Sequence, residues 1–115
     1  MIKMLKFYKI QDILDNDIII RSSCGVYILS KNRKSPYYVG RSDKNLRERI
    51  LTSSLERDCD YFSYKETNSP RDAFLLEYRY YHGLTEMGYK LANEIHPDVP
   101  DGTYWRCPIE GCEWR

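Results

Sequence analysis

Two tyrosines, an arginine and a glutamate are the residues of this sequence best suited to chemistry, namely Tyr27, Tyr38, Arg49 and Glu77. A carboxylate can hold a divalent metal, which shields a phosphate and stabilises a leaving oxygen. A guanidinium neutralises the extra negative charge of a phosphoryl transition state. A tyrosine hydroxyl whose pKa is lowered by nearby cations can take a proton from water. Together these residue types suit cleavage of a phosphodiester bond.

The same side chains also have a purely structural interpretation. An inward-facing Arg49 and Glu77 would satisfy each other as a buried salt bridge without any reaction. The tyrosine content favours polar roles, because the chain has 11 Tyr against 3 Phe and 2 Trp, and a buried phenol needs a hydrogen-bond partner. The residue types alone leave both interpretations open.

Three strands are expected to position the tyrosines. Residues 25–30 (GVYILS) are almost continuously apolar, which is typical of a strand covered on both faces. The polar turn at residues 31–36 leads into a second short strand at 37–40, so the two strands predict an antiparallel hairpin. Residues 60–67 alternate aromatic and polar side chains and predict a third strand.

A helix is predicted to begin at Asp43 or Asn45 and to run to about Arg57. The spacing of three and four residues places a common inner face on this helix, with the following members: Leu46, Arg49, Ile50 and Ser53. Since a buried helix face normally excludes a guanidinium unless an anion meets it, the arginine there suggests a functional position.

A second helix is predicted from Pro70 to about His82. Ser69 is its expected cap, Pro70 suits its first position, and Gly83 is its expected stop. Glu77 falls within an apolar stripe that this spacing creates, made of Ala73, Phe74, Tyr78 and Tyr81. A carboxylate among aromatic side chains needs a cation, a metal or a bound proton.

The order of these motifs resembles the GIY-YIG nuclease family over roughly residues 24–97. Residues 25–27 (GVY) are followed by residues 38–40 (YVG), then by the run RSDKNLRER that ends at Arg49, and later by Glu77 in the Ser-Pro-initiated helix. The resemblance implies an α/β fold of the α+β kind, with a small three-stranded antiparallel sheet flanked by helices.

The resemblance also implies a role for each matched residue. Tyr27 would activate the attacking water, and Tyr38 would lie beside the scissile phosphate. Arg49 would stabilise the transition state, and Glu77 would bind one divalent metal, Mg²⁺ or Mn²⁺. Gly40 would let backbone and phosphate approach closely. The implied activity is that of a metal-dependent endonuclease that hydrolyses DNA by a one-metal mechanism, and the composition does not distinguish DNA from RNA.

Positive charge that could contact nucleic acid is concentrated in the first half of the chain. Residues 1–57 carry 12 Lys and Arg against 6 Asp and Glu, residues 58–115 carry 6 against 11, and the formal net charge is only +1. The expected phosphate contacts are Gly40, Arg41, Lys44, Arg47 and Arg49, together with the hairpin residues Lys31, Arg33 and Lys34. The small net charge predicts weak, salt-sensitive binding.

The chain departs from the family pattern one helical turn after Arg49. Many members carry a histidine there, whereas this sequence has Ser53, which cannot relay a proton at neutral pH. His82 is a candidate substitute, although a histidine at a helix end is often simply a surface residue. Asn93 is a candidate for an asparagine found near the end of the family's domain. The alternative function is a catalytically weak or inactive nucleic-acid-binding or interaction module derived from such a nuclease.

Two flanking segments are expected around the nuclease-like domain. Residues 1–23 would be an N-terminal extension that packs on it, and residues 98–115 a C-terminal tail. The tail contains Cys107 and Cys112 in C-x4-C spacing, which suits a structural Zn²⁺ if two further ligands exist. The alternative is two free thiols.

Length and composition predict one soluble domain. The chain has 115 residues, of which 42% are hydrophobic and 30% charged. It contains neither a run of ~18 apolar residues nor a secretory signal, so we expect a cytoplasmic protein without membrane contact. Because a chain of this size has little room for a recognition domain, a protein partner is one expected source of specificity.

Overall fold

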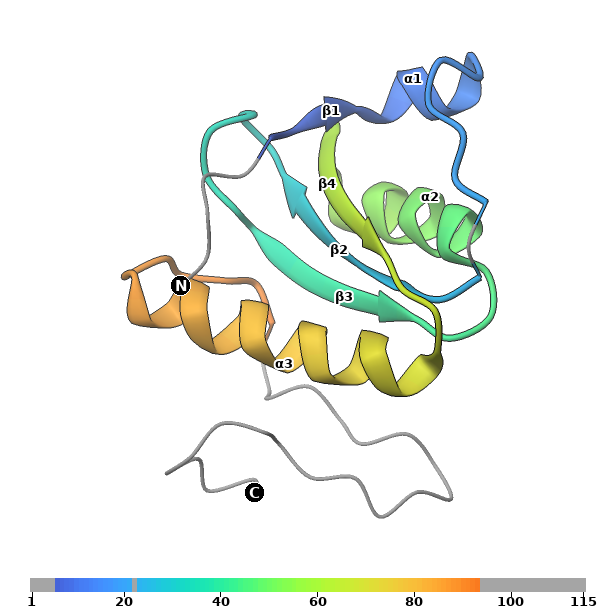
Figure 1. The fold of residues 1–115 in the computed structure, drawn as a ribbon. Helices are drawn as coiled ribbons and strands as arrows, with labels where there is room; N and C mark the ends of the chain where they lie inside the picture. The colour runs from blue at the N-terminus through green and yellow to red at the C-terminus, as the bar shows by residue number, and fades with distance from the viewer. Residues whose placement is uncertain (1–5, 22, 94–115) are drawn as a thin grey trace.

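A four-stranded antiparallel sheet flanked by helices forms the centre of the protein (Figure 1). The structure is a computed structural model and describes residues 6–21 and 23–93. In chain order the elements are β1 (Tyr8–Lys9), α1 (Ile10–Leu14), β2 (Gly25–Ser30), β3 (Tyr38–Ser42), α2 (Leu46–Arg57), β4 (Tyr61–Glu66) and α3 (Pro70–Glu86).

The sheet has the strand order β1-β4-β2-β3, with β2 and β4 in the interior and β3 at one edge. The predicted α/β class is confirmed, but the prediction of three strands was one short. The additional strand, β1, pairs with β4 through Tyr8 opposite Phe62 and Lys9 opposite Tyr61. A strand of two residues is too short to show alternation in the sequence, so only its pairing reveals it.

The two faces of the sheet carry separate cores, because side chains alternate along each strand. Tyr27 and Leu29 point to the face covered by α2, and Val26 and Ile28 point to the face covered by α3. The α2 side also buries Leu46, Ile50, Phe62, Ile13, Ile20 and Cys59. The α3 side also buries Phe7, Val39, Ala73 and Leu84. In Figure 1, α3 runs along β3 on one side of the sheet and α2 lies on the other.

Both long helices begin at the caps that the sequence predicts. The Asn45 side chain accepts a hydrogen bond from the backbone N–H of Glu48 at 3.2 Å. The Ser69 hydroxyl accepts one from the N–H of Asp72 at 3.1 Å, and Pro70 is the first residue of α3. These caps satisfy backbone donors that a helix start would otherwise leave open.

The predicted end of α3 at Gly83 was wrong. The helix continues to Glu86, because the next residue, Leu84, is buried in the core and holds the last turn against the sheet. The glycine that follows the helix is Gly88, whose φ of 95° lies in the left-handed region that favours glycine. Its N–H donates to the carbonyl of Thr85 at 3.0 Å, and the chain turns away from the helix there.

The segment before β2 contributes to the fold through buried apolar side chains. Phe7, Ile13 and Ile20 are all buried, and α1 contacts α2. Within residues 6–21 and 23–93, no helix combines the length and hydropathy needed to cross a bilayer. The tail with Cys107 and Cys112, and the predicted domain boundary near residue 97, lie outside the described residues.

Candidate active site

The two motif tyrosines lie side by side on the α2 face of the sheet. Tyr27 pairs across the strands with Gly40, so Tyr38 is its diagonal neighbour on the same face. Their ring centroids are 6.4 Å apart. Tyr27 is buried and Tyr38 is half-buried, so only Tyr38 is partly open to solvent.

Gly40 makes room for the Tyr27 ring. A Cβ placed on Gly40 would overlap the hydroxyl-bearing end of that ring. The close approach that the sequence led us to expect from a phosphate is therefore made in this structure by Tyr27. The glycine is required by cross-strand packing in its own right.

The Tyr27 hydroxyl is held inside the protein by a hydrogen bond. It lies 2.6 Å from the Ser53 hydroxyl, and either group can be the donor. Burial raises the pKa of Tyr27 to about 12, while Ser53 and the nearby Arg49 guanidinium lower it by less. The predicted lowering of a tyrosine pKa by cations was therefore wrong for Tyr27. At neutral pH its phenol keeps the proton and acts as a hydrogen-bonding group.

Arg49 was predicted on the inner face of α2, and this was wrong. The side chain is exposed, whereas Leu46, Ile50 and Ser53 are buried. At about 100° per residue, Arg49 falls roughly a quarter turn from the centre of that face. It borders the buried face closely enough for its guanidinium to interact with the Tyr27 hydroxyl.

The arginine that does lie on the inner face is Arg57, which sequence reasoning missed. Its guanidinium carbon is 3.6 Å from the centroid of the Tyr38 ring, a cation–π contact. Its Nε is buried and has no hydrogen-bond partner within the described part of the chain. The helical spacing could have predicted this position, because Arg57 lies four residues beyond Ser53 and so falls on the same inner face of α2.

Glu77 is buried, as predicted for its position in the apolar stripe, and it forms an ion pair with Arg41. The Nη1 of Arg41 is 3.0 Å from Oε1 of Glu77, and its Nε is 3.4 Å from Oδ1 of Asp43. The guanidinium also lies 5.6 Å from the centroid of the Phe74 ring. The inward salt bridge envisaged for Arg49 is thus made by Arg41.

This arrangement does not fit a resident divalent metal. Among the described residues, no group of three or more His, Cys, Asp and Glu is placed to hold one. The one carboxylate assigned to a metal, Glu77, is in contact with a guanidinium. The guanidinium also weakens the attraction of Glu77 for a metal, since two cations repel each other at one carboxylate.

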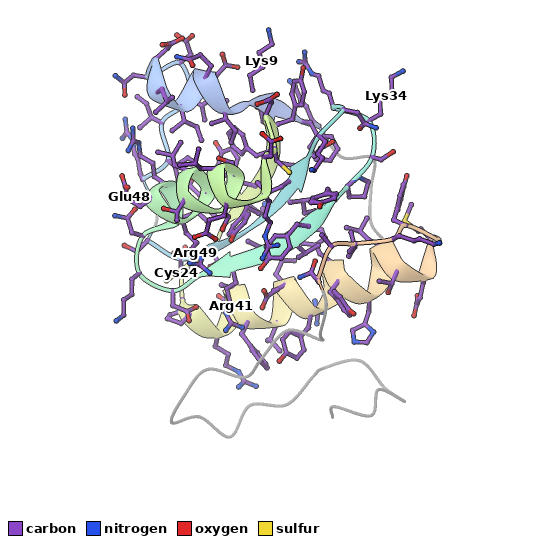
Figure 2. All side chains as sticks on the ribbon, turned by 180° about the vertical axis from the view of Figure 1, so that it is seen from behind. Lys9, Cys24, Lys34, Arg41, Glu48 and Arg49 are labelled. Atoms are coloured by element: carbon purple, nitrogen blue, oxygen red, sulfur yellow. The ribbon has the colours of Figure 1, made fainter. Side chains whose placement is uncertain are left out.

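The candidate residues fall into two groups on opposite faces of β3. Tyr38 belongs to the α2 face, and Arg41 belongs to the α3 face, because alternate residues of a strand point to opposite sides. Figure 2 shows the labelled Arg49 and Arg41 side chains near the C-terminal end of β3, in the region between α2 and α3. Since β3 is an edge strand, both groups border the same margin of the sheet.

The remaining predicted phosphate contacts lie at the surface. Lys44 is exposed, and Arg47 is half-buried with an ion pair to Glu48 at 2.9 Å. In the hairpin turn, Lys34 is exposed, Lys31 lies 4.6 Å from the Tyr37 ring centroid, and Arg33 lies 5.8 Å from that of Tyr61. The turn presents three cations, two of them held against aromatic rings.

Asn93 covers the outer edge of β3. Its amide group donates to the Val39 carbonyl at 2.8 Å and accepts from the Val39 N–H at 3.1 Å. The neighbouring Ala92 N–H donates to the Tyr37 carbonyl at 2.6 Å. Asn93 therefore occupies backbone groups that would otherwise be open for pairing with another strand.

His82, the other tentative residue, lies on α3 with its ring edge against Tyr81 at a centroid distance of 5.5 Å. It follows Glu77 by five residues, which places it about 140° around the helix from that carboxylate. The structure therefore does not bring His82 and Glu77 onto one helix face.

No family model, curated protein or solved structure matches this chain. What the site can do chemically is therefore inferred from its own side chains. On the α2 side, the two motif tyrosines lie near the guanidinium groups of Arg49 and Arg57. Such a set of donors and positive charges can bind an anion. The α3 side offers the Arg41–Glu77 ion pair.

Proposed function

We propose that this chain is a nuclease of the GIY-YIG type, which hydrolyses phosphodiester bonds of DNA in a divalent-cation-dependent reaction with Mg²⁺ or Mn²⁺. The observation that carries the proposal is the register of β2 and β3. It brings Tyr27 and Tyr38, eleven residues apart in the sequence, to a ring separation of 6.4 Å beside the guanidinium of Arg49.

The exposed position of Arg49 supports the proposal. A guanidinium at the surface can meet a phosphate of the substrate and neutralise the charge that develops on its oxygens. The half-buried Tyr38 borders the same surface and orients groups around the phosphate. Tyr27, whose pKa is about 12, serves here as a hydrogen-bonding group that holds this arrangement rather than as a base.

DNA affinity would come from phosphate contacts of the surface cations described above. Because such contacts release counterions from DNA, this affinity falls as the salt concentration rises, and a formal net charge of only +1 implies that it is weak. A protein partner that supplies specificity belongs to the same proposal.

A second function has observations in its favour, namely that of a nucleic-acid-binding module without activity. The Arg41–Glu77 ion pair occupies the carboxylate assigned to the metal, and the raised pKa of Tyr27 opposes its use as a base. The exposed Arg49 and Lys44 would still bind phosphates in such a module.

Cleavage of supercoiled plasmid in the presence of Mg²⁺ tests the proposal. We expect the native chain to nick or linearise the plasmid, and Arg49→Ala and Glu77→Gln to slow this by about 100-fold or more. Arg79→Ala, which removes an exposed arginine of α3, is the matched control and should cleave normally. Equal cleavage by all variants would contradict the assigned site. Binding without cleavage of duplex, branched or single-stranded DNA would establish the second function instead.

A further inference from the structure

Arg57 is a half-buried cation that has no anionic partner among residues 6–21 and 23–93. None of the ion pairs between these residues includes it, and its buried Nε has no hydrogen-bond partner there. A charge that is partly withdrawn from water needs an anion close by. The described part of the chain therefore leaves the positive charge of Arg57 unmatched.

The Tyr38 ring fixes the position of this guanidinium. The guanidinium carbon of Arg57 lies 3.6 Å from the ring centroid, so the cation rests against the face of the ring. A contact with a ring face uses none of the hydrogen-bond donors of the guanidinium. Because arginine presents these donors as a planar fork that matches phosphate oxygens, Arg57 is a pre-oriented donor for a phosphate.

Lys31 is held in a similar way on the neighbouring residue of the chain. Its Nζ lies 4.6 Å from the ring centroid of Tyr37, which directly precedes Tyr38. Both tyrosines pack against the core on the α2 side of the sheet. Two cations are therefore held against aromatic rings where the β2–β3 hairpin joins β3.

The buried thiol of Cys59 senses both of these cations. Burial raises the pKa of Cys59, and the charges of Lys31 and Arg57 oppose this rise. The carboxylates of Asp58 and Asp60 act on the same thiol in the opposite sense and more weakly. The local field around Cys59 is therefore dominated by positive charge, which favours an anion.

Arg57 lies at a distance from Arg49 that a short length of nucleic acid can span. The two residues are eight apart on α2, which corresponds to a rise of about 12 Å. Arg49 acts on the Tyr27 hydroxyl, whereas Arg57 contacts the Tyr38 ring. One strand of duplex DNA carries a phosphate about every 3.4 Å along the helix axis, so about four nucleotides cover this rise.

We propose that Arg57 and Lys31 form a second phosphate-binding site, which holds the DNA strand within about four nucleotides of the phosphate at Arg49. This inference rests on the proposed function and gives the bound strand a path, from Arg49 along α2 toward the β2–β3 hairpin. Figure 2 shows the labelled Arg49 near the C-terminal end of β3 and the labelled Lys34 on the hairpin at the other end of that strand. The phosphate supplies the anion that Arg57 lacks.

Binding of a short fluorescein-labelled duplex to the full chain in EDTA, followed by fluorescence anisotropy, measures this site without cleavage. We expect Arg57→Met to weaken binding by about fivefold or more, because a charge-assisted contact is lost. The slope of log Kd against log salt should decrease by about 0.9, the contribution of one phosphate contact. Arg79→Met, which removes an exposed arginine of α3, is the matched control and should change neither quantity. Equal affinity and salt dependence in the native chain and Arg57→Met overturn the proposal.

Arg57→Lys separates the charge of this residue from its packing. A lysine keeps the positive charge and loses the fork, so the salt slope should stay at the native value and the loss of affinity should be smaller than in Arg57→Met. A loss as large as that of Arg57→Met, with the same decrease in slope, overturns the proposal.

Lys31→Met tests the same site from an exposed residue if Arg57→Met does not fold, as judged by thermal unfolding. It should weaken binding of the duplex by about twofold or more. Lys90→Met, at another exposed lysine, is the control and should bind as the native chain does. Equal binding by Lys31→Met and Lys90→Met overturns the proposal.

Nuclear magnetic resonance shows whether the phosphate contacts Arg57 itself. In isotope-labelled protein, the side-chain Nε–H signal of Arg57 is identified by its absence in Arg57→Met. Saturating duplex should shift this signal and leave that of Arg79 in place. An Arg57 signal that does not move overturns the proposal.

The outcomes separate this site from the nuclease activity. Plasmid cleavage by a native chain whose affinity for duplex is insensitive to Arg57→Met overturns the second phosphate site and leaves the nuclease. A loss of affinity in Arg57→Met, with no cleavage of any DNA by the native chain, supports the second site and overturns the nuclease.

Discussion

The Tyr27 hydroxyl lies 2.6 Å from the Ser53 hydroxyl, and both side chains are buried. The resemblance led us to regard Ser53 as a missing histidine. In the structure it is the hydrogen-bond partner of the first motif tyrosine. A bulkier imidazole at this position would have to displace the Tyr27 ring, which already fills the space above Gly40.

Ser53→Ala should lower the free energy of unfolding by about 1–3 kcal/mol, because it removes a hydrogen-bond partner from a buried phenol. Ser54→Ala is the control, since Ser54 is also buried but its hydroxyl donates to the Leu51 carbonyl of its own helix, and its effect should be the smaller of the two. Urea unfolding measures both. Tyr27→Phe completes a double-mutant cycle with Ser53→Ala, and purely additive effects would show that the two hydroxyl groups are not coupled.

Stability should fall at alkaline pH through Tyr27. Its pKa is about 12 in the folded protein against 10.0 for an ordinary tyrosine, so between these values the unfolded chain loses a proton that the folded chain retains. The contribution is fully present below pH 10 and is lost as pH rises through about 12. Its size is on the order of 2–3 kcal/mol.

Tyr27→Phe provides the comparison for this pH dependence, because Tyr64 and Tyr80 also have raised pKa values and titrate in both proteins. The difference in unfolding free energy between the native chain and Tyr27→Phe should shrink from pH 9 to pH 12. A difference that stays constant over this range would mean that the Tyr27 hydroxyl titrates as an ordinary exposed phenol.

Much of the scaffold could be predicted from local signals. Asn45 and Ser69 are of residue types that favour a helix start, and residues 25–30 form the kind of short apolar, β-branched run that favours an interior strand. The Glu77 position was predictable for the same reason, since helical spacing alone decides which residues share a stripe. Local patterns of this kind depend on neighbours within one or two turns.

Partners across the fold could not be predicted in this way. From the sequence we considered only Arg49 as the ion-pair partner of Glu77. Arg41 makes the ion pair instead, because its place on β3 directs it to the face covered by α3. The pKa of Tyr27 depends on how completely α2 covers it, which no motif records. Arg57 is the intermediate case, because its position on the inner face followed from spacing but its contact with Tyr38 did not.

Gly40→Ala should destabilise the protein by about 1–3 kcal/mol, because the added methyl group overlaps the Tyr27 ring and one of them must shift. Gly88→Ala is an instructive contrast. A Cβ at Gly88 would meet no atom of the described residues within 4 Å, so the expected cost comes from the φ of 95°. Near-ultraviolet circular dichroism should change for Gly40→Ala and not for Gly88→Ala. An unchanged tyrosine signal in Gly40→Ala would contradict the packing described here.

Arg57→Met should destabilise the protein by about 0.5–2 kcal/mol, because it keeps the stem of the side chain and removes the cation from the Tyr38 ring. The buried Nε, which has no hydrogen-bond partner among residues 6–21 and 23–93, acts in the opposite direction, since its removal relieves an unsatisfied donor. We expect the cation–π contact to dominate, because the guanidinium lies as close as 3.6 Å to the ring centroid. Arg47→Met, at a surface ion pair, should change stability by less than about 0.5 kcal/mol. A gain in stability for Arg57→Met in urea unfolding would show instead that the unsatisfied donor outweighs the ring contact.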